Sequence, residues 1–311
     1  MYFPYFRGRQ YEMLALKELA LEGLLGKSII PVVEPVKLMS TFDTTLRMYS
    51  QKQYQIALIF NPSVGDFAGD NNFIQDYENR LGMIANVMPV LLMSKNTNIV
   101  LTSLAGKGVS VSNIVAFLDN RDYIGEYKKA FGNVHPCYTL FPDEREFRRT
   151  ASDVGGAKIM FRDNFAKKAR NSDYPDDSFF TDDHLYYAED GYTGFGDYSI
   201  IGSGYADGGF APYAVAIHIV YFDAENKMRV RHFISDSNED ISDVQGKFGE
   251  AVSKLAEWYD DGQQRQLTQA LSTLLQHARD GYYPGLPTIK KLSIMHHLEL
   301  VGKFLDGGLA K

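Results

Sequence analysis

The chain has 311 residues, a formal net charge of −7 and a sequence pI near 5.5, and 45% of its residues are hydrophobic. This length suits a single (β/α)8 barrel of about 250 residues that carries insertions, and the hydrophobic content excludes wholesale disorder. The acidic balance argues against a generic nucleic-acid-binding protein, and one cysteine excludes an internal disulfide.

The first 36 residues predict a strand, a helix and a second strand. An apolar run over residues 2–6 leads into a basic turn at residues 7–10 and a helical pattern over residues 10–25. A second apolar run, residues 29–33, ends at Glu34. The helix returns the chain to its starting edge, so we expect the two strands to be parallel.

The same alternation continues to about residue 165. Further strands are expected at residues 56–60, 87–93, 114–118, 134–140 and 157–161, and helices at residues 41–53, 73–83, 123–131 and 143–149. An eighth strand is expected within residues 192–201. The predicted fold class is therefore α/β, an irregular TIM-barrel-like (β/α)8 barrel in one domain over residues 1–311.

The regular pattern breaks in residues 167–240. Residues 171–183 are rich in aspartate and predict an exposed loop, whereas residues 214–222 and 228–234 flank a polar turn and predict an antiparallel hairpin. This hairpin is either an insertion or a sign of irregular barrel closure. Residues 241–311 predict C-terminal helices at residues 244–259, 263–279 and 289–305.

Ligands of parallel α/β folds bind at the carboxyl ends of the strands, so the residues just after each strand are the candidate site residues. A ring of such residues around one mouth of the barrel is expected. The candidates for catalysis are Glu34, Asp119, Asp163, Asp197 and His232, and the candidates for ligand binding are Arg7, Arg9, Gln10, Asn61, Arg121 and Arg162.

The turn Arg7-Gly8-Arg9-Gln10 suits a phosphate group, because two guanidinium groups stand beside a helix N-terminus. The alternative is that Arg9 is solvated and Arg7 pairs with Glu34 inside the mouth. The carboxylates of the ring suit a divalent metal ion or acid–base catalysis. Their alternative role is to balance the arginines as structural ion pairs.

Other reactive residues have simpler interpretations. Cys137 lies in an apolar segment, so we expect its thiol to be buried in the core rather than to act as a nucleophile. His218 is expected to be a hydrogen-bonded core histidine, and His232, close to Asp236, is the better candidate for chemistry. The sequence contains no zinc-ligand spacing, P-loop, nucleophile elbow or HExxH motif.

Residues 2–12 (YFPYFRGRQYE) and 29–35 (IIPVVEP) resemble a family of uncharacterised bacterial proteins that is distantly related to the phage "beta protein" family. The similarity extends to residues 182–184 (DDH), 194–199 (GFGDYS) and 232–238 (HFISDSN). The resemblance implies a TIM-barrel-like fold and a setting in phage defence or mobile-element conflict. It implies no reaction and no catalytic residues.

Three functions are consistent with these patterns. The first is a phage-defence or mobile-element protein that binds a phosphate-bearing ligand, such as a nucleotide, or a protein partner at the strand-end mouth. The second is a metal-dependent phosphodiester hydrolase, because barrel phosphodiesterases share the Arg7-Gly8 turn and the carboxylate at Glu34, although Phe6 replaces their histidine. The third is a protein-interaction scaffold.

No targeting signal or run of about 20 apolar residues is visible in the sequence. We therefore expect a cytosolic protein that does not act at a membrane.

Overall fold

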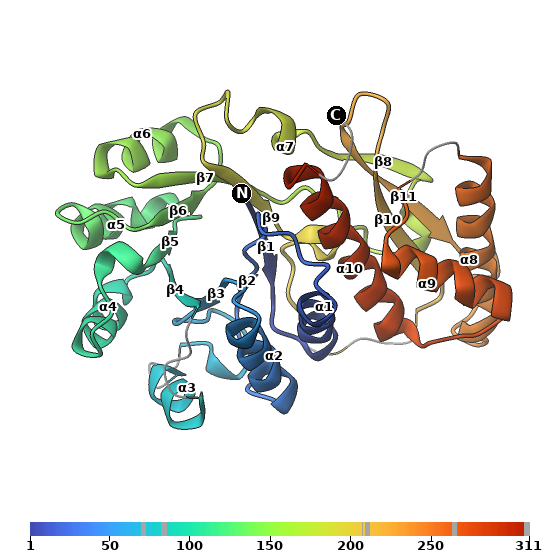
Figure 1. The fold of residues 1–311 in the computed structure, drawn as a ribbon, viewed down its shortest axis with the longest axis horizontal. Coiled ribbons are helices and arrows are strands. Elements are labelled where there is room, and N and C mark those ends of the chain that lie inside the picture. Colours follow the sequence, from blue (N-terminus) through green and yellow to red (C-terminus); the bar gives the residue numbers. More distant parts are fainter. Residues whose placement is uncertain (70–72, 82–85, 207, 209–211, 263–265, 308–311) are drawn as a thin grey trace.

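The computed structural model describes residues 1–69, 73–81, 86–206, 208, 212–262 and 266–307. Eight parallel strands form a closed barrel in the order β1-β2-β3-β4-β5-β6-β7-β9 (Figure 1). These strands are β1 (Tyr2–Phe6), β2 (Val32–Val33), β3 (Ile56–Ile59), β4 (Val87–Leu92), β5 (Val115–Phe117), β6 (Tyr138–Phe141), β7 (Ala157–Arg162) and β9 (Gly194–Asp197). The predicted TIM-barrel-like α/β fold is confirmed.

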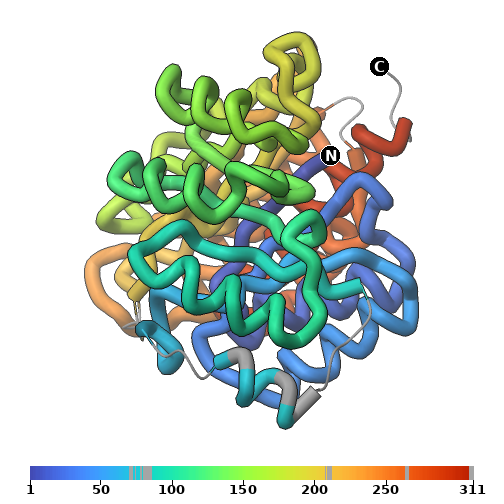
Figure 2. The backbone as a smooth tube through the Cα atoms, turned by 90° about the vertical axis from the view of Figure 1, so that its left-hand side faces the viewer, coloured from blue at the N-terminus to red at the C-terminus, as the bar shows by residue number. Residues whose placement is uncertain are grey.

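Helices follow the first six strands and cover the outside of the barrel. They are α1 (Gln10–Leu21), α2 (Ser40–Gln51), α3 (Phe73–Leu81), α4 (Thr97–Gly106), α5 (Ile124–Phe131) and α6 (Arg145–Val154). Figure 2 shows α4, α5 and α6 stacked side by side on one flank. Helix α4 was not predicted from the sequence, and the predicted end of α3, residue 83, lies outside the described residues.

A three-stranded antiparallel sheet stands beside the barrel, in the order β10-β11-β8. The predicted hairpin is present as β10 (Ala216–Phe222) and β11 (Met228–Ile234). The prediction of an exposed loop over residues 171–183 was wrong in part, because β8 (Asp177–Thr181) pairs with β11 there. The Asp177 side chain accepts a hydrogen bond from Tyr221 at 2.6 Å and pairs with Arg229, so its charge is compatible with a strand.

The C-terminal helices attach this sheet to the barrel. They are α8 (Val244–Asp261), α9 (Gln269–Asp280) and α10 (Leu286–Leu305). The remaining short helix, α7 (Asp183–Tyr186), lies earlier in the chain, before β9. Helix α10 packs against α1 on one side and against β10 and α9 on the other (Figure 1). It is buried around nearly its whole circumference, as expected for a helix between two layers. No helix in the described ranges is long and apolar enough to cross a membrane.

The alternation of side chains along the strands divides the core into two parts. One cluster fills the barrel interior and includes Phe3, Tyr5, Phe117 and Phe161. The larger cluster lies between the barrel and the surrounding helices. Strand β9 contributes Gly196 to the interior, where a Cβ atom would lie 2.6 Å from the Phe3 carbonyl oxygen and 2.7 Å from the Phe161 ring. Its neighbours Phe195 and Asp197 consequently face outward.

Candidate functional site

The first two strands place an ion pair at the centre of the barrel mouth. Arg7 follows β1 and Glu34 follows β2, and the Arg7 guanidinium donates to the Glu34 carboxylate. Tyr5, whose side chain points into the barrel, donates its hydroxyl proton to Glu34 at 2.6 Å. Of the two interpretations of Arg7 drawn from the sequence, the structure therefore shows the pairing with Glu34.

The loop after β3 completes the surroundings of Glu34. The backbone N–H and the hydroxyl group of Ser63 both donate to Glu34 Oε1, at 2.5 and 2.8 Å. Asn61 follows β3 as predicted, but its side-chain amide bonds the backbone N–H and carbonyl of Leu92, at 2.9 and 2.7 Å. Asn61 thus joins β3 to β4, and both ends of its amide group already have protein partners.

The segment after β9 lies over one side of the mouth. Arg7 donates to the Ser203 carbonyl at 2.8 Å, and Arg9 donates to the Ala206 carbonyl and lies over the Tyr205 ring. The carboxylate of Asp163, which follows β7, accepts from the Ser203 backbone N–H at 2.9 Å. The predicted residues Arg7, Arg9 and Asp163 are therefore brought together, and each of them holds this covering segment.

Tyr198 joins this group from the end of β9. Its ring packs against the rings of Tyr5 and Phe161, with centroid distances of 5.0 Å in both cases. The Arg7 guanidinium lies 5.9 Å from the same ring centroid. Burial, together with the nearby carboxylate of Asp119, raises the pKa of the Tyr198 hydroxyl. Tyr198 therefore remains a neutral hydroxyl group at the mouth.

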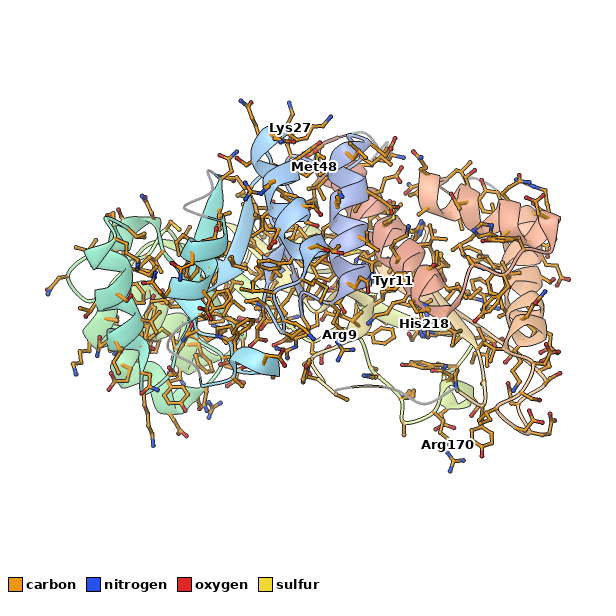
Figure 3. All side chains as sticks on the ribbon, turned by 90° about the horizontal axis from the view of Figure 1, so that it is seen from below. Arg9, Tyr11, Lys27, Met48, Arg170 and His218 are labelled. Atoms are coloured by element: carbon orange, nitrogen blue, oxygen red, sulfur yellow. The ribbon has the colours of Figure 1, made fainter. Side chains whose placement is uncertain are left out.

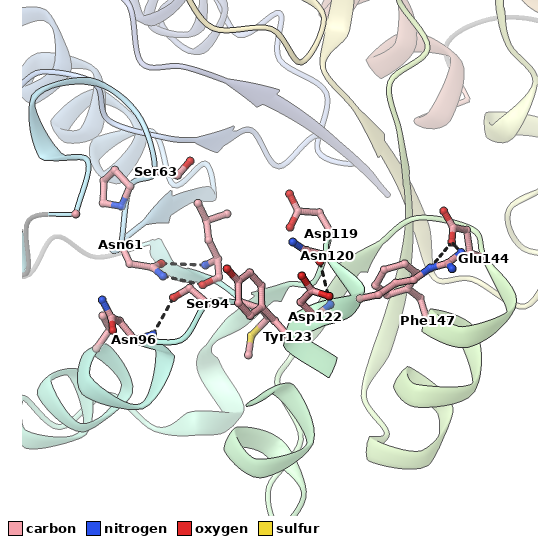
Figure 4. A pocket seen from close by; sticks show the side chains of 16 residues that line it. Asn61, Ser63, Ser94, Asn96, Asp119, Asn120, Asp122, Tyr123, Glu144 and Phe147 are labelled. Carbon is pink, nitrogen blue, oxygen red and sulfur yellow. Dashed lines mark hydrogen bonds and ion pairs between the residues drawn. The ribbon is translucent and has the colours of Figure 1, made fainter. Parts of the chain in front are cut away.

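A cavity of about 780 Å³ opens beside this cluster, at the carboxyl ends of β3, β4, β5 and β6. Figure 4 shows Ser63 and Asp119 on different walls of the same space. More than half of the lining residues carry an amide, hydroxyl or carboxylate group, namely Asn61, Ser63, Ser94, Asn96, Asp119, Asn120, Asp122, Tyr123 and Glu144. Arg121 is the one cation among the described lining residues. The volume fits a small organic ligand.

Asp119 is the lining residue best suited to proton transfer. It follows β5, and its carboxylate is reached by solvent although protein surrounds it on most sides. Partial desolvation, reinforced by the charge of Glu34, raises the pKa of Asp119, while Arg7 acts in the opposite direction. A carboxyl group with a raised pKa exchanges protons closer to neutral pH.

Two predicted arginines pair with carboxylates that the sequence analysis did not select. Arg121 pairs with Glu144 and with Glu146 at the exposed rim of the cavity. Arg162 points away from the barrel interior and donates to Asp143 at 2.9 Å and to Asp183 at 3.0 Å. Arg121 and Arg162 are therefore neutralised by structural ion pairs, as the alternative interpretation expected, but by carboxylates other than the predicted ones.

Asp197 lies at the end of β9 but faces outward, toward α10. It is completely buried, and its Oδ1 accepts from the Tyr2 hydroxyl and from the Ser199 backbone N–H, both at 2.7 Å. The Ser199 hydroxyl in turn bonds His297 of α10 at 2.8 Å. Desolvation raises the pKa of Asp197 to about 7. This residue connects the barrel to the C-terminal helix and does not line the mouth cavity.

His232 and Gln10 are also separate from the mouth cavity. His232 lies on β11 in the outer sheet, where it bonds His218 and Ser178, each at 2.8 Å. Gln10 is the exposed first residue of α1. The structure consequently groups Arg7, Arg9, Glu34, Asn61, Asp119 and Asp163 at one mouth and places the other predicted residues at its rim or elsewhere.

Sequence reasoning missed Tyr5, Ser63, Tyr198 and Ser203. Strand alternation contained the signal for Tyr5, because residues 3 and 5 must share a face. Tyr198 directly follows the predicted residue Asp197, and Ser63 lies two residues after the predicted residue Asn61. Ser203 contributes backbone groups alone, so its side-chain type carries no signal.

Within the described ranges, no group of three or more histidine, cysteine, aspartate or glutamate side chains is placed to hold a metal ion. Comparisons with protein-family models, curated proteins and solved structures give no match to this chain.

Proposed function

We propose that the barrel binds a small, hydrogen-bonding ligand without net negative charge in the mouth cavity, and that Asp119 exchanges a proton with it. A polyhydroxylated, sugar-like molecule is the ligand class that fits best. The observation that carries this proposal is the lining of the 780 Å³ cavity, where amides and hydroxyls surround an accessible carboxyl group. Such groups both donate and accept hydrogen bonds, as hydroxyl-rich ligands require.

The charge balance supports a neutral ligand over the phosphate-bearing ligand expected from the sequence. Asp119, Asp122 and Glu144 line the cavity with one guanidinium, that of Arg121, so the lining carries a formal charge of 1 − 3 = −2. Arg7 is committed to Glu34 and Ser203, and its Nε atom is too deeply buried to reach a ligand. An anion would therefore enter a site of its own sign.

The N-terminus of α1 is also occupied. Glu12 accepts from the backbone N–H groups of Arg7 and Arg9, at 2.9 and 3.5 Å, and takes the place that a phosphate would have at this helix end. Glu12 is itself buried. The feature that suggested a phosphate site is thus a helix cap formed by the chain's own carboxylate.

A thermal-shift screen with sugars, nucleosides, polyamines and sugar phosphates tests the proposal. A ligand at about 100 times its Kd should raise the free energy of unfolding by roughly 2.7 kcal/mol. We expect stabilisation by a neutral hydroxyl-rich class and its loss in Asp119→Asn. Stabilisation by the phosphate-bearing compounds alone would overturn the choice of ligand, and no stabilisation by any class would favour a protein-interaction scaffold.

The setting in phage defence or mobile-element conflict is part of this proposal and is supported by the resemblance in residues 2–12 and 29–35. Cells that produce the wild-type chain or the Asp119→Asn variant are challenged with a panel of phages. We expect a change in plating efficiency that requires Asp119. Equal plating on cells with and without the wild-type chain, across the panel, would remove the phage setting while leaving the ligand site intact.

A further inference from the structure

A second cavity, of about 250 Å³, lies between α10, β10 and the segment that follows β7. It shares no lining residue with the mouth cavity. Figure 3 shows His218, one of its lining residues, at the junction between the barrel and the C-terminal helices. The volume corresponds to roughly eight molecules of liquid water and fits a small metabolite.

Two histidines on neighbouring strands form a hydrogen-bonded pair at this cavity. His218 of β10 stands opposite His232 of β11, and their Nδ1 atoms lie 2.8 Å apart. His232 Nε2 lies 2.8 Å from the Ser178 hydroxyl. These contacts use three of the four ring nitrogens of the pair. The fourth, His218 Nε2, has no protein partner in the described ranges, and His218 lines the cavity.

The aromatic rings around the pair hold both imidazoles in place. Tyr174 stacks on His232 with a centroid distance of 4.8 Å and lies 4.7 Å from His218. Phe165 meets His218 edge-on at 5.2 Å. Desolvation lowers the pKa of His218 to about 3 and that of His232 to about 4, so both rings are neutral at neutral pH.

The chain of neutral groups from Ser178 through His232 to His218 allows two directions of hydrogen bonding. If the Ser178 hydroxyl donates to His232 Nε2, His232 carries its proton on Nδ1 and donates to His218 Nδ1. His218 then carries its proton on Nε2 and offers it to the cavity. In the opposite direction His218 Nε2 is an acceptor, so the ligand's charge selects between the two arrangements.

The remaining lining decides the sign of that charge. Lys167 and Lys290 line the cavity, and no aspartate or glutamate is found among the described lining residues. Lys290 also reaches Glu12, at 3.3 Å, whereas Lys167 is exposed beside the cavity. The lining also includes the aliphatic side chains of Ile200, Leu286 and Ile289. The cavity therefore offers both cationic groups to an anion and hydrocarbon surface to an apolar body.

We propose that this cavity binds a small carboxylic acid with an apolar or aromatic body, whose carboxylate accepts from His218 Nε2–H and lies near Lys167. The apolar body packs against the aliphatic wall. This assignment is independent of the ligand proposed for the mouth.

Benzoate is the probe for this site, observed through the histidine ring ¹⁵N and ¹H resonances of the wild-type protein. The benzoate-bound protein should show His218 protonated on Nε2 and His232 on Nδ1. Benzoate should shift the His218 resonances saturably and raise the pKa of His218, because an adjacent anion favours the imidazolium form. Benzyl alcohol, which lacks the charge, and inorganic phosphate, which lacks the apolar body, should each bind at least about tenfold more weakly.

Lys167→Met should weaken benzoate binding by about tenfold, a change of ~1.4 kcal/mol. Lys168→Met removes the neighbouring exposed lysine, which does not line the cavity, and should leave the affinity unchanged. Asp119→Asn should also leave it unchanged. The proposal is overturned if roughly 20 mM benzoate gives no saturable shift at His218, if phosphate binds as tightly as benzoate, or if the two lysine variants behave alike.

Discussion

Arg7 and Glu34 form an ion pair in which the Glu34 side chain is completely buried and the Arg7 side chain is 13% exposed. The Tyr5 hydroxyl and two groups of Ser63 fill the remaining hydrogen-bonding positions of that carboxylate. Three consecutive strands of the barrel are thus connected through one charged group. Since a buried charge is tolerated only when its partners are present, each partner contributes to the stability of the mouth.

Arg7→Met should destabilise the protein strongly. The substitution preserves much of the side-chain volume but leaves the buried carboxylate of Glu34 without its counter-charge. Loss of one member of a buried pair typically costs about 3–5 kcal/mol. Urea unfolding, followed by circular dichroism, measures the change in the free energy of unfolding.

Arg121→Met is the matched control, because the side chains of Arg121 and Glu144 are 62% and 45% exposed. A pair this exposed contributes little to stability, because solvent screens it. The double variant Arg7→Met/Glu34→Met should recover part of the loss. Equal destabilisation by the two single arginine variants would contradict the importance of burial at the mouth.

Asp197→Asn should change how stability depends on pH. The pKa of Asp197 is raised to about 7 in the folded chain and is about 3.9 in an unfolded chain. At pH values between these two pKa values, the native state binds more protons than the unfolded state. The contribution of Asp197 to the free energy of unfolding is therefore fully present below pH of about 4 and is lost as the pH rises through about 7. As the pH rises through this range, the free energy of unfolding of the wild type should fall by up to about 1.4 kcal/mol per pH unit more than that of the variant.

The asparagine variant retains an acceptor for the Tyr2 hydroxyl and the Ser199 N–H, so the comparison isolates the ionisation. Unfolding free energies at several pH values between about 4 and 8 give the two slopes. Asp153→Asn, which removes an exposed carboxylate paired with Lys128, serves as the control for net charge. Parallel curves for the wild type and Asp197→Asn would refute the assignment.

The Cys137 thiol should react slowly in the native protein. It donates to the Ile114 carbonyl at 3.1 Å, and desolvation raises its pKa to about 11. Because the thiolate is the nucleophile, alkylation by iodoacetamide at pH of about 8 should be at least about a hundredfold slower than for an unstructured peptide. The same protein unfolded in urea is the control. A native rate close to the unfolded rate would show that the thiol is accessible and ionised.

The barrel could be predicted because its strands are short, apolar runs that end in polar residues. Three predicted strands end within one residue of the observed strands β1, β3 and β7, namely those at residues 2–6, 56–60 and 157–161. Helix α4 was missed because it is apolar over much of its length and lacks an amphipathic pattern. Strand β8 was missed because pairing with β11 overrides the local preference of Asp177 and of the aspartates that precede the strand.

The candidate site was predicted in outline, since strand ends converge wherever parallel strands close into a barrel. Sequence position alone did not determine which way each side chain points. Asp197 faces outward because the neighbouring Gly196 occupies the interior position, and Arg162 faces outward because Phe161 fills the core. The partners of Arg121 and Arg162 lie on separate elements and were not visible as local patterns.

Gly26→Ala should weaken the attachment of α10 to the barrel. A Cβ atom at Gly26 would lie 2.6 Å from the Gly302 Cα atom, and backbone on both sides leaves no flexible group to yield. Next to this contact, the Asp306 carboxylate accepts from the Lys27 N–H at 2.7 Å and from the Ser28 hydroxyl at 2.6 Å. Displacing α10 would disturb these bonds, so we expect a loss of about 1–3 kcal/mol.

Gly106→Ala is the control, because Gly106 lies in α4 and an added Cβ atom would meet nothing within 4 Å. Alanine favours helix over glycine, so this variant should be neutral or more stable by up to about 1 kcal/mol. Hydrogen exchange locates the effect: Gly26→Ala should accelerate exchange in α10 and in the turn at residues 26–28, which precedes β2. Uniform acceleration across all strands, or no destabilisation at all, would show that α10 does not depend on this close contact.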